Sequence, residues 1–225
     1  MLDWRTDLRA LPGSALDDLR GVLECGPLFA LGAGGLASYG VRVTWDDDVA
    51  DHFRGRHRND FNDWMAVLGG PGPQFGVWAG VYWLSLKRQD NDLHEFSLAF
   101  LNGWMISNST NLGLKFIVNS DKPNGEHGGW PSGHVESTML VAVMVDEYYG
   151  WQAALPLYGL VGAVAYARMS DEEHYLSDVV FGATLGYVVG RTVARRHQQT
   201  VCGGRLTTYV DAGTRSRGIA WVREF

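Results

Sequence analysis

Three short polar segments interrupt otherwise apolar stretches in the second half of the chain. They are Lys115–Pro123, which holds a second lysine at Lys122, then Pro131–His134, and then Arg168–Asp178. Lysine and arginine side chains attract anions, and a histidine can act as a nucleophile or carry a proton. These residue types therefore indicate chemistry on an anionic group.

The middle segment favours an anion site at the start of a helix. A helix that begins after Pro131 would present free backbone N–H groups and the positive end of its dipole. The hydroxyl of Ser132 and the imidazole of His134 would point to the same place, and Gly133 lets a ligand approach the backbone closely. Pro-Ser-Gly alone is also ordinary loop sequence, so this segment needs support from the others.

The third segment supplies a nucleophile and its support. His174 and Asp178 are four positions apart, so they share a face if the stretch is helical. The carboxylate can then hold one imidazole nitrogen and leave the other free to attack. Arg168 can donate two hydrogen bonds to phosphate oxygens, and Lys115 and Lys122 would complete a pocket for a dianion.

Each of these features also has a structural interpretation when it is taken alone. Lys115 could be a lysine that extends from a helix end into water, and His174 with Asp178 could be a structural pair. In combination the three segments favour a site of phosphoryl transfer.

Composition sets the limits for this interpretation. The chain has 225 residues, 46% of them hydrophobic and 12% aromatic, and a net charge of −6. Such a chain is not intrinsically disordered, and without a basic block it is not expected to bind nucleic acid. Its two cysteines, Cys25 and Cys202, lack the spacing of a zinc site. We favour two free thiols over one disulfide, and we predict no metal site.

Hydrophobic periodicity predicts an all-α bundle of one domain, residues 1–225, with a small β-hairpin in residues 201–225. The hairpin would pair Arg205–Val210 with Gly218–Arg223 through Asp211–Thr214, and Asn119–Gly133 would be a loop. Cys25–Val41 is a glycine-rich apolar segment to which we assign no helix. The predicted helices are Ser14–Leu23, Trp45–Arg54, Phe75–Lys87, Leu93–Val118, His134–Tyr149, Trp151–Arg168 and Tyr175–His197.

The order of the three polar segments resembles the signature of the type 2 phosphatidic acid phosphatase superfamily. Bacterial class A acid phosphatases and vanadium-dependent haloperoxidases belong to the same superfamily. The signature spans Lys115–Asp178, and the helical character is similar over about residues 45–197. The resemblance implies a helical bundle of the acid phosphatase and vanadium haloperoxidase type.

The resemblance also implies a role for each site residue. His174 would attack phosphorus and form a phosphohistidine, Asp178 would orient His174, and His134 would protonate the leaving group and then activate water. The phosphate oxygens would be bound by Lys115, Lys122, Ser132, Gly133 and Arg168. The scheme needs no metal or other cofactor, and vanadate would inhibit the enzyme.

Two positions depart from the family pattern. Lys122 stands where the family usually has arginine, so the charge is kept but the two-pronged hydrogen bonding is lost. Ala167 stands where the family usually has serine. Neither change removes the nucleophile, its carboxylate or the proton donor. We therefore predict a metal-independent phosphatase of phosphomonoesters, whose substrate is a phosphorylated small molecule or a lipid phosphate.

Two alternative functions stay open at this point. One is a haloperoxidase that carries vanadate as a prosthetic group in the same site. The other is a non-catalytic anion-binding or membrane protein. The sequence does not indicate an oligomeric state.

The sequence gives mixed indications about a membrane. Tyr148–Ala167 has the length and apolar content of a span, but other uncharged stretches are interrupted by glycine, proline or asparagine. The mean hydropathy of −0.11 is low for a protein with several spans, so we favour buried core helices. The first twenty residues mix acids with arginines, unlike a cleavable signal peptide. By resemblance, we expect the protein at the bacterial cell envelope or a membrane.

Overall fold

The computed structural model describes residues 2–55, 59–198, 200–201, 204–210 and 217–222. Within these residues the chain forms nine α-helices followed by three short strands, which confirms the predicted helical fold. The helices are α1 (Trp4–Val22), α2 (Cys25–Thr44), α3 (Asp46–Phe53), α4 (Asp60–Leu68), α5 (Pro71–Arg88), α6 (Asn91–Val118), α7 (Gly133–Tyr149), α8 (Trp151–Ser170) and α9 (Leu176–Gln198).

The strands follow α9 directly. They are β1 (Thr200–Val201), β2 (Gly204–Val210) and β3 (Arg217–Val222), and β2 pairs antiparallel with both of its neighbours. Leu206 lies opposite Trp221 in the β2–β3 register. The predicted turn at Asp211–Thr214 lies outside the described residues, as does Cys202, so the turn and the state of that cysteine stay predictions. Cys25 is exposed and has a free thiol.

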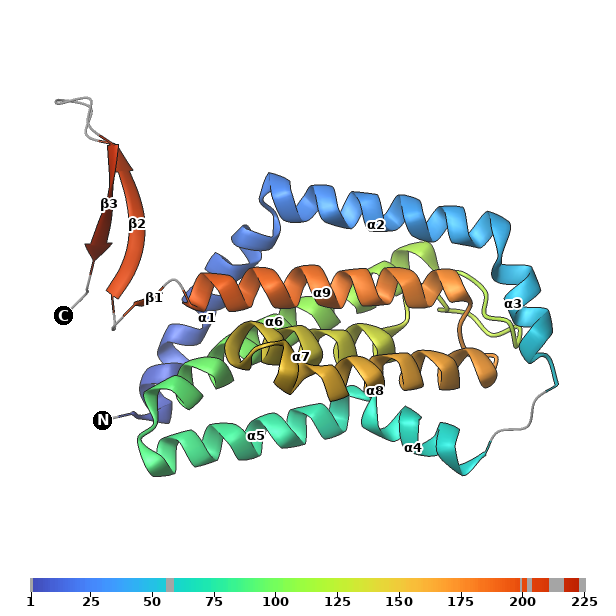
Figure 1. The fold of residues 1–225 in the computed structure, drawn as a ribbon, viewed down its shortest axis with the longest axis horizontal. Helices are drawn as coiled ribbons and strands as arrows, with labels where there is room; N and C mark the ends of the chain where they lie inside the picture. The colour runs from blue at the N-terminus through green and yellow to red at the C-terminus, as the bar shows by residue number, and fades with distance from the viewer. Residues whose placement is uncertain (1, 56–58, 199, 202–203, 211–216, 223–225) are drawn as a thin grey trace.

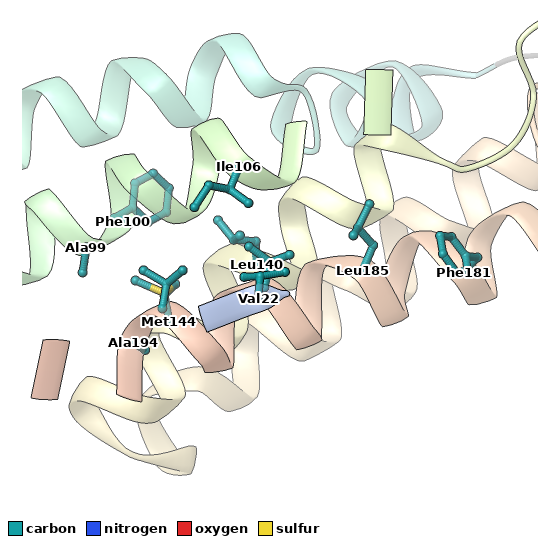
Figure 2. Close-up of a cluster of buried hydrophobic side chains, with 11 residues drawn as sticks. Val22, Ala99, Phe100, Ile106, Leu140, Met144, Phe181, Leu185 and Ala194 are labelled. Carbon is teal, nitrogen blue, oxygen red and sulfur yellow. The ribbon is translucent and has the colours of Figure 1, made fainter. Parts of the chain in front are cut away.

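Helix α9 is the central element of the bundle. It packs against α2, α6 and α7, while α8 packs on α7 and α5 packs on α6 (Figure 1). Apolar side chains from α1, α6, α7 and α9 form the main core (Figure 2). Leu140, Met144 and Leu185 are among its fully buried members. Burial of such side chains contributes about 1.5–3 kcal/mol each and fixes the positions of these helices relative to one another.

Glycines at every fourth position bring α9 very close to α7. Gly182 and Gly186 lie on one face of α9, against the first turns of α7. A Cβ atom on Gly186 would lie 2.2 Å from the carbonyl oxygen of Glu136, and one on Gly182 would lie 2.5 Å from that of Ser132. No larger side chain fits at this backbone separation. The contact places the start of α7 beside the start of α9.

Three elements differ from the sequence prediction. Helix α1 begins at Trp4 and not at Ser14, because Asp3 caps it by accepting a hydrogen bond from the Arg5 amide. Residues 60–68 form α4, which we did not predict as a separate helix, and Asn59 caps it in the same way. Residues 25–44 form α2, although we assigned no helix there.

The helical state of α2 follows from its packing. Glycine weakens an isolated helix by about 1 kcal/mol relative to alanine, so the composition argued against a helix. The helix packs along α9, however, and a Cβ on Gly34 would lie only 2.3 Å from the Thr184 methyl group. The same small residue that lowers helix propensity therefore permits close contact with α9.

Among the described residues, no single helix is long and apolar enough to cross a membrane. Helices α1 and α2 pass that test only as a pair, and the chain bends by 61° between them.

We predict that Gly186→Ala destabilises the protein, because its Cβ would overlap the backbone of α7. Overpacking of this kind costs about 1–3 kcal/mol in the free energy of unfolding, measurable by chemical denaturation. The matched control is Gly162→Ala in α8, where no heavy atom lies within 4 Å of the added Cβ. The control should be neutral or slightly stabilising. Equal stability of the two variants would contradict the close α7–α9 contact.

Candidate active site

The predicted site residues gather at one end of the bundle. The loop between α6 and α7, the end of α8, the start of α9 and the short helix α3 all meet there (Figure 1). The third polar segment follows the first two only after α7 and most of α8, yet the fold brings all three to this one end. All eight predicted residues lie on these elements, on the adjoining last turn of α6 or first turn of α7, or in the segment between α8 and α9.

His174 and Asp178 form a buried pair at the start of α9. Nδ1 of His174 lies 3.2 Å from Oδ2 of Asp178, and the same oxygen accepts a hydrogen bond from the Tyr175 amide at 3.0 Å. His174 lies just before α9 and Asp178 in its first turn, so the helix start positions the pair. Burial lowers the pKa of His174 although Asp178 acts to raise it. The ring is thus held by one nitrogen, and Nε2 is the nitrogen available for chemistry.

The start of α7 is tied directly to this pair. Ser132 is the N-cap of α7, and its amide donates to the Asp178 carbonyl oxygen at 3.0 Å. The Ser132 hydroxyl is fully buried and has no hydrogen-bond partner among the described residues. Gly133 follows, and a Cβ there would lie 3.3 Å from Oδ1 of Asn111. A buried hydroxyl without a partner at a helix N-terminus fits an anion oxygen.

His134 follows Gly133 in the first turn of α7. Burial lowers its pKa to about 4, and the positive charges of Arg168 and His174 act in the same direction. The imidazole is therefore neutral at pH 7 in the empty site. Its electrostatic interaction with Arg168 and His174 shows that the second and third polar segments lie near each other in one site.

Lys115 extends from α6 toward the loop before α7. Its ammonium group donates to the carbonyl oxygens of Gly128 and Gly129, at 2.6 and 3.1 Å. Burial lowers the pKa of Lys115 to about 8, against the attraction of Asp178. This lysine is thus a partly buried cation that binds the loop before α7. It does not extend from the helix end into water, as the structural interpretation of the sequence would have it.

Lys122 and Arg168 share an acidic neighbour, Glu173. Oε2 of Glu173 lies 2.9 Å from Nζ of Lys122 and 3.3 Å from a terminal guanidinium nitrogen of Arg168. Lys122 also contacts the exposed carboxylate of Glu126 at 2.8 Å. Burial lowers the pKa of Lys122, but the two carboxylates raise it by more, so it is fully charged.

A supporting acid that the sequence analysis missed is Asp46, at the start of α3. Its carboxylate accepts from the Ser177 amide at 2.9 Å and from the Ser177 hydroxyl at 2.5 Å. From α2, the Ser38 hydroxyl donates to the carbonyl oxygen of Ser177 at 2.9 Å. Trp130 completes the link, since its indole N–H donates to Ser38 at 3.1 Å.

The sequence held only a weak signal for this role. Asp46 begins a run of three aspartates, which we interpreted as the acidic first turn of a helix. The structure confirms that helix start, but it buries Asp46 and leaves its two neighbours exposed. The contact between Asp46 and Ser177 arises from the packing of α3 on α9. The spacing of residues in the sequence therefore could not predict it.

The comparisons with known proteins concern the family and the fold. Residues 108–202 match the family model of the PAP2 superfamily, and this range contains all eight predicted site residues. A sequence comparison with curated proteins gave no match. The structure resembles the crystal structure of a transmembrane PAP2-type phosphatidylglycerolphosphate phosphatase from Bacillus subtilis, with a TM-score of 0.52 and 15% identity. The likeness covers 86% of this chain and 96% of that one.

These findings confirm the family resemblance inferred from the sequence. Residues 108–202 match the PAP2-superfamily model, and the chain has a helical fold similar to that of a PAP2-type protein. The shared fold extends beyond the matched region and takes in most of the chain.

We predict that Asp46→Ala loosens the start of α9. The change would leave the buried amide and hydroxyl of Ser177 without their acceptor, at a cost of about 1–3 kcal/mol. Amide hydrogen exchange of a peptide covering residues 171–180 should become about tenfold faster or more. The matched control is Asp48→Ala, two positions along and exposed. Unchanged protection in the Asp46 variant would show that Asp46 does not support the site.

Proposed function

We propose that the protein is a phosphatase that hydrolyses phosphomonoesters through a phosphohistidine at His174, without a metal ion. The observation that carries the proposal is the arrangement of His174. One ring nitrogen is held by buried Asp178, and His134, Lys115 and Arg168 all act on the site electrostatically. A carboxylate, a fixed imidazole and several cations are what metal-free phosphoryl transfer needs.

Substrate binding would use the cations and the start of α7. Lys115, Lys122 and Arg168 would bind the phosphate oxygens, with the Ser132 hydroxyl and the Gly133 amide as further donors. The unpartnered hydroxyl of Ser132 supports this assignment. Burial is the main cause of the lowered pKa of Lys115, and repulsion from Lys122 and Arg168 adds to it. Binding of a dianion would relieve that repulsion.

The reaction would proceed in two displacements. In the first, Nε2 of His174 attacks phosphorus, the bond to the ester oxygen breaks, and His134 donates its proton to the departing alkoxide. In the second, His134 takes a proton from water, the hydroxide attacks phosphorus, and the P–N bond breaks. The products are the alcohol and inorganic phosphate, and both histidines return to their starting states.

His134 must be protonated when the substrate is bound. In the empty protein its pKa is about 4, chiefly because the ring is buried. A phosphate dianion beside the ring would favour the charged imidazolium and raise that pKa. The proton donor is thus formed only when the substrate is present, and acidic solution assists this step.

Lipid phosphates are the substrate class that the surface near the site favours. Lys115 is followed by Phe116 and Ile117, whose residues are 78% and 81% exposed, and Leu112 lies one turn earlier with 55% exposed. Apolar surface beside a phosphate site suits a substrate with an acyl chain. The similar Bacillus subtilis protein is a phosphatidylglycerolphosphate phosphatase, which supports the same class.

The first test is phosphate release from p-nitrophenyl phosphate in the presence of a chelator. We expect turnover by the wild-type protein and none above background for His174→Ala, which lacks the nucleophile. His134→Ala should lose about 10²–10⁴-fold, the usual contribution of general acid–base catalysis. Turnover that requires an added metal would contradict the mechanism, and turnover by His174→Ala would overturn the nucleophile.

The matched control for both variants is His127→Ala. This histidine lies in the loop between α6 and α7 with its side chain 71% exposed, paired with Asp121. Its activity should equal that of the wild type. A lipid phosphate in mixed micelles, assayed in parallel, should give the higher kcat/KM if the apolar surface beside Lys115 contributes to binding.

The pH dependence of kcat/KM should reflect the ionisation of Lys115. With a pKa of about 8, Lys115 is charged below that pH and neutral above it, so phosphate binding weakens as the pH rises through 8. Since kcat/KM reports the free enzyme, its value should fall above about pH 8. In Lys115→Arg the group stays charged, and the fall should move to higher pH. An identical alkaline limb in both proteins would contradict the assignment.

A further inference from the structure

Glu173 occupies the two cations that would receive a phosphate. A single carboxylate oxygen of Glu173 lies 2.9 Å from Lys122 and 3.3 Å from Arg168. Its side chain is 25% exposed, so the contact is partly shielded from water and is not an ordinary surface ion pair. Carboxylate and phosphate oxygens accept hydrogen bonds from the same donors with similar geometry. The resident carboxylate and an incoming phosphate therefore compete for the same groups.

We propose that Glu173 is a resident anion that a phosphate must displace, and that it thereby determines which anions the site accepts. This inference rests on the proposed function, because it takes Lys122 and Arg168 as phosphate ligands. A dianion interacts with the two cations more strongly than a carboxylate does, whereas a singly charged ligand gains no such advantage. The site would therefore select dianionic monoesters over singly charged anions.

The surrounding backbone allows the Glu173 side chain to move without unfolding the loop. Its amide donates to the Arg168 carbonyl oxygen at 3.1 Å. The preceding residue, Glu172, has a left-handed φ of 57°. Its carboxylate accepts from the Gly55 amide at 2.8 Å, and its carbonyl oxygen accepts from Asn124 at 3.1 Å. With the backbone held at Glu172 and Glu173, rotation of one side chain is enough to release the cations.

Lys122 would not be left without a counter-charge when Glu173 moves. Glu126 contacts the same ammonium group at 2.8 Å, and its side chain is 65% exposed. Burial raises the pKa of Glu173, but Lys122 and Arg168 lower it by more, so the carboxylate is ionised. The two acids thus differ in one respect that an experiment can use. Both contact Lys122, but of the two only Glu173 bridges to Arg168 in the described ion pairs.

The test is the affinity of the purified protein for inorganic phosphate, measured by titration calorimetry at one pH and ionic strength. We expect Glu173→Gln to bind phosphate about tenfold more tightly than the wild type, because the substitution removes the charge that competes with phosphate for Lys122 and Arg168. Glu173→Asp, which keeps the charge on a shorter side chain, should give an intermediate gain. Glu126→Gln is the matched control and should change the affinity by about twofold at most.

Equal or weaker phosphate binding by Glu173→Gln, with the fold intact by thermal unfolding, would overturn the inference. That result would mean that Glu173 holds Lys122 and Arg168 in place for the substrate. Absence of phosphate binding in all the variants would overturn it as well, since the cations would then not form an anion site. Tighter phosphate binding by Glu173→Gln, together with no hydrolysis by the wild type, would contradict the proposed function. It would still support the role of Glu173 as a resident anion.

Discussion

The close approach of α7 and α9 is the constraint on which the rest of the site depends. The glycines at 182 and 186 bring the two helices close enough for the Ser132 amide to donate to the Asp178 carbonyl oxygen at 3.0 Å. That hydrogen bond joins the start of α7, the proposed anion site, to the start of α9, which carries the proposed nucleophile His174 and its partner Asp178. Packing in the core thus sets the geometry of the chemistry at its end.

A second consequence of this packing is that several charged groups of the site lie buried or partly buried. Burial lowers the pKa of both Lys115 and His134, so a positive charge on either group is held at a cost. Asp178 and Glu173 offset part of that cost, but in different ways. Asp178 is fully buried and fixed, whereas Glu173 is partly exposed on a side chain that can turn.

The sequence predicted much of this arrangement, for physical reasons that can be named. The spacing of His174 and Asp178 and the helix-opening Ser132 are local features, and local features follow from backbone geometry. Helix α2 and the role of Asp46 could not be predicted in the same way. Both depend on contacts with α9, across about 130 positions of sequence for Asp46 and Ser177. Propensity argued against α2, and tertiary packing overrode it.

The part of the chain that precedes residue 108, outside the family match, is nevertheless connected to the site. Asp46 from α3 and Ser38 from α2 both bind Ser177, the residue immediately before Asp178. The Trp130 indole binds Ser38 in turn, and its ring packs on Phe181 at 4.3 Å between centroids. The start of α9 is therefore fixed to both α2 and α3, and the loop before α7 is fixed to α2. Since an active site must hold its groups within a fraction of an ångström, these helices serve the site as positioning elements. A fragment limited to the family-matched residues would keep every proposed catalytic group and lose the contacts that orient them.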